Sequence, residues 1–163
     1  MAIRFVHAGD LSRPNDLISG APLFPYAKPG LLPDVPTVQD ILQARRLRDR
    51  YEPQIWQHWA DAAGWDGPPL DTQISRLRAP LAVEATCAGY GVYLSSAECV
   101  NAHCQRGTLK RLSDVSLTDG AFRLLLQEGS ARRKPIRIVR EWLLDLTAKF
   151  RDTPFWEVDQ PFG

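Results

Sequence analysis

The sequence has almost no excess charge of either sign, with 20 lysines and arginines against 19 aspartates and glutamates in 163 residues. Domains that bind DNA through its phosphates usually carry a basic excess or a basic stripe. The densest basic segment, residues 132–134 followed by Arg137 and Arg140, is interpreted as a solvated loop and helix face. We therefore expect no direct DNA binding by this chain.

Cysteine and long apolar runs are also scarce. The three cysteines, Cys87, Cys99 and Cys104, are odd in number and irregularly spaced, which does not fit a disulfide framework and favours a reducing cytoplasm. No run approaches the roughly 18 apolar residues of a membrane span, and residues 1–4 lack the apolar stretch of a signal peptide. We expect a cytoplasmic protein without a membrane segment.

The sequence lacks the familiar loops that bind nucleotides. There is no Walker loop, and Gly89 and Gly91 are too few to make a dinucleotide fingerprint. Cys99 and His103 lie four residues apart with Cys104 adjacent, so on a helix the first two could share a metal or form a nucleophile and its base. A structural zinc site needs four ligands, however, and no orienting group follows this pair. We expect no cofactor, no metal and no enzymatic activity.

Periodicity and turn signals predict alternating strands and helices. Thr37, with Asp40 three residues later, should cap a short helix, and Trp56 and Trp59 should share the buried face of the next helix rather than bind a ligand. Such alternation predicts an α/β fold with a largely parallel sheet. The expected strands are 3–6, 21–28, 46–48, 72–77, 92–94 and 122–127, and the expected helices are 37–43, 54–63, 80–87, 97–105 and 135–150.

Residues 79–96, APLAVEATCAGYGVYLSS, carry more information than any single motif. They resemble the segment of LysR-type transcriptional regulators in which an alanine-rich helix ends in Gly-x-Gly-Val and enters a buried strand. The glycines suit the turn between helix and strand. Other segments are similar to this family in the same order: 2–5, 22–32, 105–112, 122–126 and 135–150. The resemblance is greatest to the branch that includes the glycine-cleavage activator.

This resemblance implies periplasmic-binding-protein-like type 2 lobes without the family's DNA-binding domain. The second regulatory lobe, residues 29–116, is expected to be complete. The first lobe is expected to be partial, made of residues 1–28 and 117–152, with an irregular tail at 153–163. The implied function is a small-molecule effector-binding module of a truncated bacterial transcription regulator.

Ligand sites of the family lie at strand ends and in the loops that follow them. The implied effector is small and polar or a carboxylate, and Arg48 or Arg76 would pair with it, although a surface arginine is an equally good interpretation. The residues implied to bind it are Phe5, Val6, His7, Arg48, Asp49, Ser75 and Arg76.

A partial first lobe should leave the apolar stripe of the last helix without its usual cover. This stripe comprises Ile136, Val139, Leu143, Leu146 and Phe150. Such a surface tends to find a partner, so we expect a homodimer or larger homo-oligomer. The alternative function is therefore a protein-interaction module that pairs with itself or with an intact regulator. A thiol or metal enzyme that uses Cys99, His103 and Cys104 is the third hypothesis.

Overall fold

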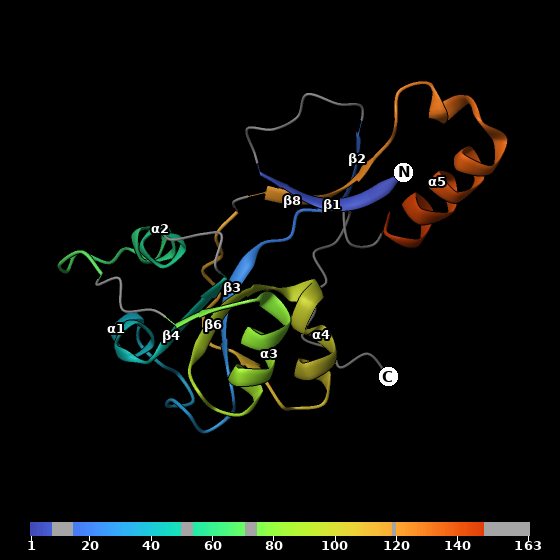
Figure 1. Ribbon diagram of the computed structural model, residues 1–163. Helices are drawn as coiled ribbons and strands as arrows, with labels where there is room; N and C mark the ends of the chain where they lie inside the picture. Colours follow the sequence, from blue (N-terminus) through green and yellow to red (C-terminus); the bar gives the residue numbers. More distant parts are fainter. Residues whose placement is uncertain (8–14, 50–53, 71–74, 119, 149–163) are drawn as a thin grey trace. The chain divides into compact units, whose positions relative to one another are not determined.

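The computed structural model describes residues 1–7, 15–49, 54–70, 75–118 and 120–148, and they form two compact units (Figure 1). The first unit consists of Met1–Pro22 and the chain from Thr118 onward, and the second unit is Leu23–Leu117. The boundaries predicted from the sequence were 28/29 and 116/117. They differ because Leu23–Ala27 is a strand of the second unit's sheet and Leu117 pairs with Leu23.

The first unit contains a three-stranded antiparallel sheet with β8 (Gly120–Leu125) in the centre. Strand β1 (Ala2–His7) flanks it on one side and β2 (Asn15–Ser19) on the other. Gly120 must lack a side chain, because a Cβ there would lie 2.5 Å from the carbonyl oxygen of Val6. The unit also contains the 3-10 helix η1 (Ser130–Arg132) and helix α5 (Lys134–Leu146), which contacts η1 and β2.

The second unit contains a five-stranded mixed sheet in the order β5-β4-β6-β3-β7. Strand β4 runs parallel to both β5 and β6, whereas β3 runs antiparallel to β6 and β7. The expectation of a largely parallel sheet was wrong, because four of the six strand pairings in the described residues are antiparallel. The strands are β3 (Leu23–Ala27), β4 (Arg46–Asp49), β5 (Ser75–Leu77), β6 (Val92–Ser96) and β7 (Lys110–Arg111).

Four helices of the second unit lie where the sequence predicted them. In α1 the side chain of Thr37 accepts a hydrogen bond from the backbone of Asp40, and the Asp40 carboxylate accepts one from the backbone of Thr37. Ser96 precedes α4, and its hydroxyl donates to Cys99 Sγ rather than capping a backbone group. The helices are α1 (Val38–Gln43), α2 (Ile55–Ala62), α3 (Ala79–Cys87) and α4 (Ala97–Gln105).

The core of the second unit joins α1 and α2 to one face of the sheet. Ile41 of α1 and Trp56 and Trp59 of α2 pack in one cluster with Val92 and Leu94 of β6. Alternate strand residues point to opposite faces, and α3 and α4 also contact β6, so helices cover both faces of this strand. The two tryptophans are 1% and 0% exposed, which confirms their predicted place in the core.

The predicted last helix is confirmed, and its apolar stripe is only partly covered: Ile136 and Leu143 are half-buried, and Val139 and Leu146 are exposed. No residue of α5 is buried, although Ile136, Val139, Leu143 and Leu146 recur at helical spacing. Phe150, the last residue of the predicted stripe, and the predicted tail 153–163 lie outside the described residues.

Candidate functional site

The predicted ligand residues of the second unit lie together at the ends of two paired strands. Arg48 of β4 is the register partner of Arg76 of β5, and Leu47 is the partner of Ser75. Asp49 is the last residue of β4. Because β4 and β5 are parallel, their carboxyl ends meet at one edge of the sheet, which is where ligands bind in open α/β sheets.

Arg48 is a buried arginine, with only 4% of its surface exposed. The alternative interpretation of this residue as a surface arginine was therefore wrong. Arg46, two residues earlier on the same strand, is 8% exposed, and residues two apart on a strand point to the same side. Guanidinium groups stay charged in proteins, so β4 holds two buried positive charges on one side. Buried charges are retained where they pair with groups of opposite charge.

Two serines that were not among the predicted ligand residues lie at the same end of the sheet. Ser95 and Ser96 end β6 and are 4% and 5% exposed. Strand β6 is parallel to β4, so its carboxyl end lies at the edge where β4 ends. The sequence signal was available: VYLSS places two hydroxyls at the end of an otherwise apolar strand.

The other three predicted ligand residues belong to the first unit. Phe5, Val6 and His7 form the end of β1, opposite Phe122, Ala121 and Gly120 of β8. Phe5 is half-buried and packs edge-to-face on Phe122, with 5.6 Å between ring centroids. Phe5 therefore has a structural role within its own sheet. The side chains of His7, Asp49 and Arg76 lie outside the described residues.

The cysteine and histidine cluster differs from the one considered in the sequence. His103 contacts Cys87 of α3, with 3.2 Å between Nδ1 and Sγ, while the Sγ of Cys99 accepts a hydrogen bond from Ser96. Burial raises the pKa of the Cys104 thiol to about 11. Among the described residues no group of three or more histidine, cysteine, aspartate and glutamate side chains is placed to hold a metal ion. Sequence reasoning did not connect Cys87 with His103, because they are 16 residues apart on different helices.

Comparison with known proteins relates the chain to others through structure rather than sequence. No protein-family model matches the chain, and no curated protein matches its sequence. The effector domain of the transcriptional regulator AmpR of Pseudomonas aeruginosa is similar in structure, with a TM-score of 0.80 and 24% identity over 92% of this chain and 73% of that one. The AmpR effector-binding domain from Citrobacter freundii gives 0.78 and 19%, over 90% and 74% of the two chains.

A third structural neighbour is a member of the LysR family. The regulatory domain of CrgA, a LysR-type transcriptional regulator from Neisseria meningitidis, gives a TM-score of 0.68 and 17% identity over 90% of this chain and 74% of that one. Within the described part of the chain, no helix is both long and apolar enough to cross a membrane.

These structural similarities show that the two α/β units have the periplasmic-binding-protein-like type 2 fold of the effector-binding domains of LysR-type regulators.

Proposed function

We propose that this chain is a small-molecule effector-binding module of a transcription regulator and not an enzyme. Its effector is a small polar molecule or a carboxylate, bound at the carboxyl ends of β4, β5 and β6. The observation that carries the proposal is Arg48, an arginine only 4% exposed near a strand end in a fold whose neighbours are effector-binding domains. The proposed setting is the bacterial cytoplasm.

The side chains at the carboxyl ends of these strands favour an anionic ligand. Arginine presents a planar array of donors that matches both oxygens of a carboxylate, and such pairs are stronger than neutral hydrogen bonds. The buried hydroxyls of Ser95 and Ser96 lie at the end of the neighbouring strand, where their oxygens can accept hydrogen bonds.

Thermal-shift screening against amino acids and small organic acids tests this proposal. A ligand that binds only the folded state raises the melting temperature as its concentration exceeds the Kd. We expect at least one carboxylate to raise it in a saturable way and the corresponding amide or ester to have no effect. A panel in which no compound shifts the melting temperature would contradict the proposal.

A second function, self-association, is favoured by the exposed apolar face of α5. Trp142 is 58% exposed, Leu146 is 54% exposed and Val139 is 38% exposed, and none of the residues of this helix is buried. We propose that α5 pairs with a second copy of this chain, or with an intact regulator of the same fold. A contiguous apolar surface of this kind commonly marks an interface.

Light scattering at tens of micromolar tests the self-association. The wild type should be dimeric or larger, and Trp142→Ser with Leu146→Ser should shift it to monomer without loss of helix content. A wild-type protein that is monomeric at this concentration would contradict the proposed homo-oligomer. Co-purification with a full-length regulator over a range of salt concentrations tests the proposed pairing with an intact regulator.

A further inference from the structure

We propose that Cys87 and His103 form a thiol modification site at which Cys87 forms a mixed disulfide with a small disulfide. Cys87 is the last residue of α3, and His103 lies in the last turns of α4. The distance from Cys87 Sγ to His103 Nδ1 is 3.2 Å, so a thiol proton and a basic nitrogen are in contact. This site does not depend on the proposed effector function.

The neighbours of His103 determine which nitrogen of its ring is the base. The guanidinium of Arg106 lies 3.3 Å from Nδ1 and the hydroxyl of Thr108 lies 3.4 Å from it. A guanidinium has only donors, so its partner must be a nitrogen with a free lone pair. In the tautomer that carries its proton on Nε2, this lone pair can take the Cys87 thiol proton, in competition with the Arg106 guanidinium.

The three cysteines of the chain differ in what they contact. Cys99 is exposed, and its Sγ accepts a hydrogen bond from the Ser96 hydroxyl, which cannot take up the thiol proton at neutral pH. Cys104 is half-buried, and burial raises the pKa of its thiol to about 11, which keeps it in the unreactive protonated form. Cys87 combines partial exposure with an imidazole that can accept its proton.

The exchange step balances without any further reactant. His103 Nδ1 takes the proton of the Cys87 thiol, and the thiolate sulfur attacks one sulfur of the small disulfide. The new bond joins Cys87 Sγ to that sulfur as the disulfide bond of the reagent breaks. The departing thiolate takes the proton from the imidazolium and leaves as a free thiol. The small disulfide is the oxidant, and a reducing thiol reverses the reaction.

The test is the rate at which each cysteine reacts with an aromatic disulfide that releases a coloured thiolate, with peptide mass spectrometry to assign the sites. Each rate is divided by the rate of the same cysteine in the urea-unfolded chain. We expect the normalised rate of Cys87 to exceed that of Cys99, although Cys99 is the more exposed residue. Cys104 should react last.

Replacement of His103 separates assistance by a base from the simple exposure of the thiol. His103→Gln should slow Cys87 at least about tenfold and leave the rate of Cys99 unchanged. If Cys99 reacts before Cys87 in the wild type, or if His103→Gln leaves the rate of Cys87 unchanged, the proposal is overturned. Should His103→Gln unfold the protein, seen as rapid labelling of Cys104, the order of reaction in the wild type decides.

Discussion

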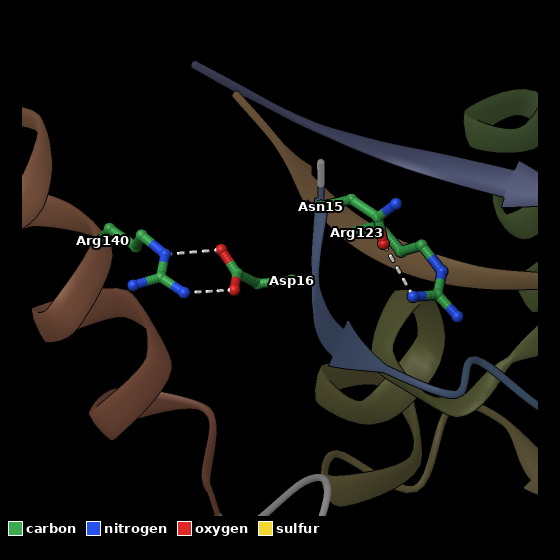
Figure 2. A network of polar contacts seen from close by, with 4 residues as sticks. All are labelled: Asn15, Asp16, Arg123 and Arg140. Atoms are coloured by element: carbon green, nitrogen blue, oxygen red, sulfur yellow. Dashed lines mark hydrogen bonds and ion pairs between the residues drawn. The ribbon is translucent and has the colours of Figure 1, made fainter. Parts of the chain in front are cut away.

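Arg140 of α5 and Asp16 of β2 form a two-pronged ion pair across 124 residues of sequence (Figure 2). The Nε of Arg140 donates to Oδ2 of Asp16 at 2.7 Å, and a terminal nitrogen donates to Oδ1 at 2.5 Å. The Asp16 carboxylate raises the pKa of Arg140 through these hydrogen bonds. Beside it, Arg123 of β8 donates to Asn15 at 2.8 Å, so β2 has polar contacts with both the helix and the central strand.

Loss of this ion pair should loosen α5, because the helix buries no side chain of its own. Arg140→Met should reduce the stability of the first unit by roughly 1 kcal/mol, since the side chains are 36% and 18% exposed and solvent screens the charges. Amide hydrogen exchange of α5 should become faster than in the wild type. Asp16→Asn should have an effect of similar size.

Arg137 on the same helix provides the matched control. Its ion pair with Glu141 is longer, at 3.9 Å, and both side chains are well exposed, at 59% and 61%. Arg137→Met should leave exchange in α5 almost unchanged. Equal effects of the two variants would mean that Arg140 holds the helix no better than a surface charge.

Trp56 should be the more sensitive of two tryptophans to replacement by phenylalanine. Its indole nitrogen donates to the carbonyl oxygen of Leu47 at 2.8 Å in the core, and Trp56→Phe removes this buried hydrogen bond. Urea unfolding should show that the free energy of unfolding falls by roughly 1–3 kcal/mol. Trp142→Phe, at a position 58% exposed, should stay within about 0.5 kcal/mol of wild type. Similar losses would contradict the placement of these two side chains.

Gly91 should tolerate no side chain. A Cβ there would lie 2.3 Å from the carbonyl oxygen of Arg45, and this same oxygen accepts the backbone hydrogen bond of Val92 at 2.8 Å. Gly91→Ala should destabilise the second unit by roughly 1–3 kcal/mol. At Gly20 an added Cβ would meet no atom within 4 Å, so Gly20→Ala is the control and should be tolerated. A stable Gly91→Ala protein would show that this turn can move.

Stability should fall in alkaline solution partly because of Cys104. Burial raises the pKa of its thiol from 9.0 to about 11 in the folded protein, so the unfolded chain loses this proton first. The contribution of the protonated Cys104 thiol to the free energy of unfolding is complete below about pH 9 and is lost as the pH rises toward 11. Cys104→Ala should flatten the dependence of unfolding free energy on pH in this window, whereas Cys99→Ala should not. Parallel curves for wild type and Cys104→Ala would exclude this contribution.

Features set by neighbouring residues were predictable from the sequence, and pairings between distant strands were not. Thr37 with Asp40 indicated the start of α1, and the spacing of Trp56 and Trp59 indicated the buried face of α2, because both signals are local. The antiparallel direction of β3 was missed. It depends on Phe24 meeting Ser95, a strand pairing between distant segments that no periodicity records.

The same distinction, between local sequence signals and contacts of distant segments, applies to the candidate site. The position of Arg48 at a strand end was predicted from resemblance, but its burial was not, since an arginine between Leu47 and Asp49 reads equally well as a surface residue. The contact of Cys87 with His103 was missed because the sequence pairs His103 more naturally with Cys99 on its own helix.

Arg48 is the residue proposed to bind the anionic effector, and its replacement tests the effector-binding function most directly. The measurement is calorimetric titration of wild type, Arg48→Met and Arg45→Met with a carboxylate found by thermal-shift screening. Arg45 is an exposed arginine that directly precedes the amino end of β4, opposite the proposed site, and serves as the control. Arg48→Met should weaken binding at least about tenfold, as expected for loss of a charged pair worth roughly 1.5–3 kcal/mol, while its own melting temperature shows that it remains folded. Equal affinity in a folded Arg48→Met protein would contradict the proposed role of this arginine.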